Sequence, residues 1–108
     1  MDPRQLLQLF YKPGCKAYQV LVRHGEQVAR KALAIADHVS AMTPDRTFIS
    51  EAAMLHDIGI FLTAAPTIGC TGSQPYIRHG ILGREILEQC GLAQHALVCE
   101  RHVGVGLT

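Results

Sequence analysis

Two adjacent residues with metal-binding and proton-transfer chemistry, His56 and Asp57, lie inside an apolar segment at positions 52–61. The apolar residues around the pair recur at roughly helical spacing, and Gly59 follows where a left-handed cap would end a helix. The segment therefore predicts a helix that carries His56 and Asp57 in its last turn. A dipeptide this short is, by itself, most often an ordinary helix end.

Histidine recurs once in each of four predicted helices, at His24, His56, His79 and His102. A single histidine on an apolar face is usually a core residue, but helix bundles commonly build metal sites from side chains that project inward from facing helices. Imidazole and carboxylate ligands without thiolate suit several divalent ions, and the choice among Mn, Fe, Co, Ni, Zn and Mg stays open. His38 and His95 lack such support and are expected at the surface or beside the ligands.

Apolar periodicity and turn residues divide the chain into helices. We expect a short helix after Asp2, a long one over about 17–42, and a third that begins near position 46. A loop over 62–74, rich in Gly, Pro, Ser and Thr, separates these from helices over 75–91 and 92–103. No segment alternates apolar and polar residues as a strand would. The fold prediction is all-α: a single compact domain over residues 1–108, with about five helices.

Composition narrows the class of protein. The 108 residues are 48% hydrophobic and 18% charged, and ten Lys and Arg against nine Asp and Glu give a net charge of +1. This balance predicts no nucleic acid polymer as a partner, and no apolar run is long enough for a membrane span. We expect a cytoplasmic protein. Its four cysteines lack metal-binding spacing and are expected to be reduced and mostly buried.

The same residues resemble a known family. His24, the tetrapeptide at 56–59 (HDIG), the segment at 79–87 (HGILGREIL) and the pair Arg101-His102 are similar to motifs of the HD domain superfamily of metal-dependent phosphohydrolases, in its HDIG subgroup. The matching stretch runs from about Tyr18 to Val103. The resemblance implies a helical bundle with one or two metal ions at its centre, in agreement with the all-α prediction.

The resemblance also implies roles for residues. His24, His56 and Asp57 would bind a metal ion, and His79 and His102 would bind a second ion or a substrate phosphate. Asp57 and His79 are the implied catalytic residues. Three arginines adjoin proposed ligands and could bind phosphate oxygens through the guanidinium group, although a solvated surface arginine is the commoner case at such positions; they are Arg23, Arg78 and Arg101.

The implied function is metal-dependent hydrolysis of a nucleotide or other small phosphate ester. The family pattern includes a further aspartate after the later histidine, yet no aspartate follows Asp57. An alternative is therefore a catalytically impaired HD-like module that serves metal binding or oligomerisation. A homodimer that covers the position of the missing C-terminal helix is also possible, because such a gap would expose an apolar patch.

Overall fold

The computed structural model describes residues 1–104, and it is an all-α bundle. The prediction of about five helices is confirmed by α1 (Pro3–Leu7), α2 (Lys16–His38), α3 (Arg46–Leu55), α4 (His79–Gln89) and α5 (Ala93–Gly104). Four short 3₁₀ helices join them: η1 (Ser40–Met42), η2 (Ile58–Leu62), η3 (Pro66–Ile68) and η4 (Tyr76–Arg78). The predicted domain also included positions 105–108, which lie outside the described residues.

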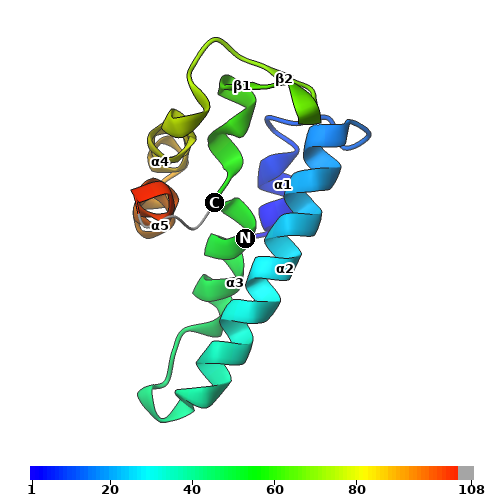
Figure 1. Cartoon of the computed structure of the whole chain (residues 1–108). Coiled ribbons are helices and arrows are strands. Elements are labelled where there is room, and N and C mark those ends of the chain that lie inside the picture. Colours follow the sequence, from blue (N-terminus) through cyan, green and yellow to red (C-terminus); the bar gives the residue numbers. More distant parts are fainter. Residues whose placement is uncertain (105–108) are drawn as a thin grey trace.

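Four of the helices form two packed pairs, α2 with α3 and α4 with α5, and α3 with the following η2 lies at the centre of the bundle (Figure 1). Helices α2 and α3 lie side by side and run in opposite directions, and α4 packs on α5. The segment of α3 and η2 lies between α2 and the α4–α5 pair, and α4 contacts η2 closely. The side chains that meet there are fully buried, and each such aliphatic side chain contributes about 1.5–3 kcal/mol; they include Leu7, Leu55, Ile58 and Leu87.

Local sequence explains where the main helices begin. The Asp45 carboxylate accepts the amide N–H of Phe48 at 3.0 Å, which satisfies one of the free donors in the first turn of α3. The Asp2 carboxylate accepts the N–H of Arg4 in the same way at the start of α1. Helix α2 ends at His38 rather than near 42, because the chain tightens into the 3₁₀ turn η1.

The third helix ends earlier than its apolar pattern predicts. Helix α3 stops at Leu55, His56 caps it, and Asp57 leads into η2. The apolar pattern continues past the end of α3 because residues of η2 are also buried, among them Ile58 and Ile60. The predicted placement of both residues in the last helical turn is therefore wrong for Asp57.

Gly59 has a different role from the predicted left-handed cap. Only Gly69 and Gly91 have positive φ among the glycines of the described chain. Gly59 instead allows η2 to lie directly against α4, since a Cβ there would overlap the carbonyl oxygen of His79 and the backbone nitrogen of Gly83. This close approach brings the residue after His56 next to the start of α4.

The predicted loop over 62–74 contains a small hairpin. Strands β1 (Ala64–Ala65) and β2 (Cys70–Thr71) pair antiparallel, with Ala64 opposite Thr71. Gly69, at φ 82°, supplies the left-handed residue that the turn between them requires. Strands of two residues are too short to produce a pattern of alternation, which is why the sequence did not reveal them.

None of the helices within residues 1–104 combines the length and apolar character needed to cross a lipid bilayer. All four cysteines are free thiols. Cys70 and Cys99 are buried, Cys15 is half-buried and Cys90 is exposed. It follows Gln89 at the end of α4, beyond the buried face of that helix.

Candidate metal centre

Five side chains from four different parts of the chain meet at the centre of the bundle. His24 comes from the middle of α2, His56 and Asp57 from the junction of α3 and η2, and two more histidines from the start of α4 and the end of α5. These last two are His79 and His102. The structure therefore brings together all five residues that the sequence suggests as metal ligands.

The Asp57 carboxylate lies between two pairs of imidazoles. Its Oδ2 atom is 3.4 Å from Nε2 of His24 and 3.1 Å from Nε2 of His56. Its Oδ1 atom is 3.2 Å from Nε2 of His79 and 3.0 Å from Nε2 of His102. The five residues thus form two groups of three potential ligands that share one carboxylate. A carboxylate in this position can bridge two ions.

Three of the four imidazole rings are oriented by the backbone. Nδ1 of His56 lies 2.6 Å from the carbonyl oxygen of Ala53, three residues earlier. Nδ1 of His79 and of His102 make the same contact with the residue three positions back, at 2.7 and 2.6 Å. A carbonyl oxygen only accepts hydrogen bonds, so Nδ1 carries the hydrogen in each ring. In the neutral rings Nε2 is then a free lone pair that points into the cluster.

Converging lone pairs and a carboxylate need a positive partner. Nε2 of His24 and His56 are 3.2 Å apart, and Nε2 of His79 and His102 are 3.0 Å apart. The buried Oδ1 of Asp57 has no hydrogen-bond donor when Nδ1 holds the ring hydrogens. Either additional protons or a metal cation satisfies all of these acceptors, and histidine that donates Nδ1–H to a carbonyl is the usual arrangement of a metal ligand. The residues present therefore fit a divalent ion.

The electrostatics without a metal favour protonated imidazoles. Burial works against charge on His56 and His79, but hydrogen bonding to Asp57 and its negative charge outweigh this, so the pKa of each imidazole is raised. Burial would likewise raise the pKa of Asp57, yet hydrogen bonds from His102, His56 and His79 hold it well below its usual range. Asp57 is thus a carboxylate at any physiological pH. Asp57 consequently supplies a permanent carboxylate, whose charge is balanced by protonated imidazoles or by a bound cation.

The two ligand groups differ in access. Side chains of His79 and His102 are 0% and 4% exposed, whereas that of His24 is 35% exposed. A pocket of about 560 Å³ lined by His24, Asp57 and the β1–η3 segment opens on one side. A second, largely apolar pocket of about 530 Å³ reaches His24, His56 and His102 between α2, α3 and α5. A ligand from solution can therefore approach the His24 side of the centre.

The other candidate residues lie outside the cluster. The arginines proposed to bind phosphate are exposed, and no ion pair or hydrogen bond joins them to the cluster within residues 1–104; they are Arg23, Arg78 and Arg101. His38 is exposed at the end of α2. His95 is half-buried and pairs with Glu51 at 3.0 Å, away from the metal ligands.

Two aromatic residues that the sequence patterns did not single out support the metal centre. The Tyr11 hydroxyl donates to the carbonyl oxygen of Ile58 at 2.7 Å and accepts the N–H of Phe61 at 2.9 Å, so it holds η2 beside Asp57. Tyr76 lies against the His79 ring, with centroids 4.5 Å apart. Tyr11 is 47 residues from Ile58 in sequence, and no local pattern reports a contact over that separation.

Comparison with known proteins gives relatives of a different kind from those expected. No family model and no solved structure matches the chain significantly. It is 30% identical over 107 residues to a protein of Thermoplasma volcanium named tRNA (cytidine(56)-2'-O)-methyltransferase, covering 98% of this chain and 27% of that protein. A Picrophilus torridus protein of the same name is 32% identical over 93 residues, which is 85% of this chain and 23% of that protein.

A third relative, an uncharacterized protein of Methanocaldococcus jannaschii, is 34% identical over 77 residues, which is 70% of this chain and 39% of that protein. This chain thus spans about a quarter of the length of the two relatives with functional names. The match to them extends over most or nearly all of this chain.

These names contradict the predicted membership of the HD phosphohydrolase superfamily and the predicted hydrolysis of a phosphate ester. They do not support the impaired HD-like module either. The expectation that no nucleic acid polymer is involved conflicts with relatives named for tRNA. The reason for the error is that histidine and aspartate spacing reports how ligands can be placed on helices, and the same placement serves unrelated reactions.

Proposed function

We propose that this chain is a metal-binding helical domain that acts in tRNA modification, together with a methyltransferase of the kind for which its relatives are named. The domain binds one or two divalent ions at His24, His56, Asp57, His79 and His102. It contacts tRNA, and the methyl transfer itself is assigned to the remaining length of such proteins, since the chain matches only about a quarter of them.

The metal part of the proposal is supported chiefly by one observation: four imidazole Nε2 atoms converge on the Asp57 carboxylate, whose buried Oδ1 has no donor while the rings are neutral. Leaving a buried acceptor unsatisfied costs about 1–3 kcal/mol. A cation removes this cost. An ion held there with an open position on the His24 side would also supply positive charge to a phosphate oxygen of RNA.

The tRNA part is supported by the names of two relatives and by the extent of the match to them. The pocket beside His24 and Asp57 gives an RNA phosphate a route to the metal. A role in tRNA modification would place the protein in the cytoplasm. Substrate roles for Arg23, Arg78 and Arg101 remain predictions.

Elemental analysis of protein purified without chelators tests the metal. We expect at least one transition-metal ion per chain, and almost none in the double variant His56→Ala/Asp57→Ala. The chain offers a matched control in Asp37 and His38, an exposed acid and histidine adjacent on α2. The variant Asp37→Ala/His38→Ala should keep its metal. Absence of metal from the parent protein, or equal loss in both variants, would overturn this part.

An electrophoretic shift of bulk tRNA tests the second part. Metal-loaded protein should retard tRNA more strongly than it retards a DNA duplex of similar length, and removal of the metal by a chelator should weaken the shift. Failure to bind tRNA at low salt would reject the role in tRNA modification while leaving the metal site intact.

Self-association is a separate proposal. The apolar pocket between α2, α3 and α5 is bordered by the exposed residue Ile35, and it is the surface that a second copy could cover. Sedimentation of the parent protein should then show a dimer, and Ile35→Glu should shift it to the monomer. A monomeric parent protein would exclude this proposal.

A further inference from the structure

Helix α2 carries a row of positively charged side chains on the side that faces away from the bundle. Lys16, Arg23 and Arg30 are spaced by seven residues, which is close to two helical turns, so they share one face. All three side chains are exposed. We call these three residues the basic face of α2. The neighbouring Lys31 is also exposed, but it lines the apolar pocket beside His24 and does not belong to this face. Helix α2 forms one edge of the bundle, with α3 and the α4–α5 pair on the same side of it (Figure 1).

The acids of α2 do not neutralise this face. Glu26 pairs with Arg4 of α1 at 3.0 Å, and Asp37 pairs with Arg46 of α3. None of the three residues of the basic face takes part in an ion pair within residues 1–104. The two acids thus compensate cations from other elements, and they lie on the flank toward α1 and α3.

Charge is therefore segregated in a chain whose net charge is only +1. Over about 21 Å of helix, at 1.5 Å per residue, three cations are presented, and the one acid within this stretch, Glu26, is paired with Arg4. An overall balance of ten basic and nine acidic residues hides this local excess, which is why the composition argued against a nucleic acid partner. Binding of RNA depends on the local arrangement of Lys and Arg, since each neutralised phosphate releases counterions.

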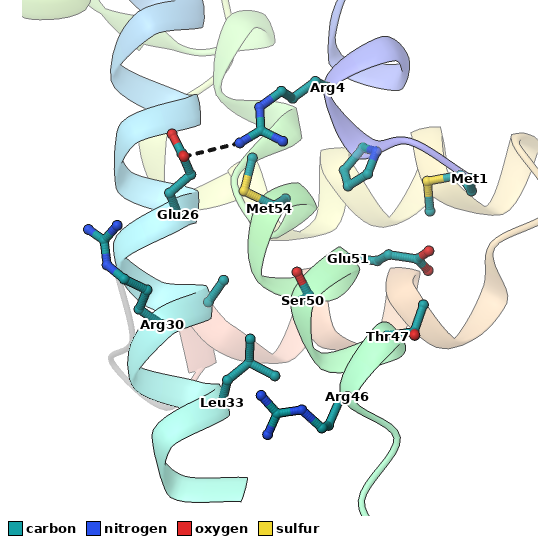
Figure 2. Close-up of a pocket in the computed structure, with 12 residues that line it drawn as sticks. Met1, Arg4, Glu26, Arg30, Leu33, Arg46, Thr47, Ser50, Glu51 and Met54 are labelled. Atoms are coloured by element: carbon teal, nitrogen blue, oxygen red, sulfur yellow. Dashed lines mark ion pairs between the residues drawn. The ribbon is translucent and has the colours of Figure 1, made fainter. Parts of the chain in front are cut away.

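A pocket lies beside the basic face at Arg30. It has a volume of about 550 Å³ and lies between α1, α2 and α3. Figure 2 shows Arg30 directed away from α3, whereas Arg4 reaches across to Glu26 and the Ser50 hydroxyl lies over α3. Arg30 is thus free to meet a ligand that lies along the outer side of α2. The pocket itself is lined by the carboxylates of Glu26 and Glu51, so the surface suited to phosphate is the outer side of the helix and not the pocket.

We propose that the basic face of α2 binds the phosphate backbone of tRNA, at a surface separate from the metal centre. The inference rests on the proposed role in tRNA modification and names the surface that serves it. Phosphate contacts position an RNA without selecting its sequence, so this face would orient the tRNA while other parts of a methyltransferase read it.

The test measures binding of fluorescent bulk tRNA from about 50 to 200 mM salt. The face variant is Lys16→Gln/Arg23→Gln/Arg30→Gln. Its matched control, Arg84→Gln/Gln89→Glu/Gln94→Glu, lies on α4 and α5, and both variants take the formal net charge from +1 to −2. We expect the face variant to bind at least about tenfold more weakly at the lowest salt. The slope of log affinity against log salt concentration should become less steep by about 2 to 3, because each lost contact between a cation and a phosphate reduces it by roughly one unit. The control should stay within about threefold of the parent protein.

Metal content and thermal unfolding are measured on all three proteins, so that a folding defect is recognised. Equal weakening in both variants would show that net charge alone governs binding and would overturn the inference, with tRNA binding itself still standing. A parent protein that does not bind tRNA would reject both the role in tRNA modification and this surface. Neither result depends on the metal centre, whose occupancy is an independent readout.

Discussion

The two halves of the metal centre share Asp57 but are built differently. His79 and His102 are buried, and backbone carbonyl oxygens fix both rings through Nδ1. His24 is about one-third exposed, and no backbone acceptor holds its Nδ1 among the described residues. One half is thus deeply buried and preorganised, with only the apolar pocket reaching His102, while the other borders both pockets.

This difference suggests a division of work within the proposed centre. A preorganised, dehydrated set of ligands holds an ion tightly because little ordering entropy remains to be lost on binding. A half that borders solvent leaves room for water or a phosphate oxygen to complete the coordination. We therefore expect the buried half to bind the more tightly held ion and the open half the more exchangeable one.

Removal of the shared carboxylate tests the comparison most severely. Asp57→Asn keeps the shape of the side chain but removes the charge and ligand common to both halves. We expect affinity for metal to fall by about 100-fold or more, in competition with a chelating dye. Asp37→Asn, at an exposed acid of α2, is the control. Retention of both ions by Asp57→Asn would refute the shared site.

Substitution of one histidine from each half should separate them. His79→Ala should remove the tightly held ion and, because it empties a fully buried position, lower the free energy of unfolding by about 2–4 kcal/mol. His24→Ala should release the weaker ion and cost less than about 1 kcal/mol. Chemical denaturation and metal titration provide both values. Similar losses from the two variants would show that the halves are equivalent.

The pH dependence of stability should reverse when metal binds. In the metal-free protein the raised pKa of His56 and His79 gives a contribution that is complete below about pH 6.5 and is lost as pH rises through the folded-state values. The lowered pKa of Asp57 adds a contribution that is present above about pH 4 and is lost in stronger acid. Metal requires unprotonated Nε2, so the loaded protein should lose metal and stability below about pH 6.

Thermal unfolding at mildly acidic and mildly alkaline pH, with and without metal, measures this reversal. We expect the metal-free protein to melt higher on the acid side and the loaded protein on the alkaline side. The same pH profile in both forms would contradict histidine ligation.

The smallest effect is expected at the support of the shared residue. Tyr11→Phe removes the hydroxyl that links Ile58 and Phe61, and it should destabilise the protein by about 1–2 kcal/mol. Metal affinity should change by less than about threefold, because Tyr11 touches η2 and not a ligand atom. A large loss of metal in this variant would show that Tyr11 is needed for metal binding, contrary to its position against η2.

Much of the fold follows from local sequence. Apolar residues at three- and four-residue spacing, Pro3 and the capping residue Asp45 indicate where helices run, and the all-α prediction agrees with the structure. Local patterns failed where a long-range contact decided the conformation. The end of α3 and the conformation of Gly59 depend on the close approach of η2 to α4, and the β1–β2 hairpin is too short to leave a periodic pattern.

The sequence by itself determined which side chains could bind a metal: four histidines on separate helices and one aspartate. Only the tertiary structure decided that their Nε2 atoms converge on the two oxygens of Asp57, that Nδ1 is fixed by backbone carbonyls, and that one half is deeply buried. It also decided which arginines remain exposed and unpaired on α2. The spacing of side chains in the sequence determines which of them share a face of a helix, but the distances between helices depend on packing over the whole chain. Overall composition likewise gives only the net charge and does not show where cations gather on the surface.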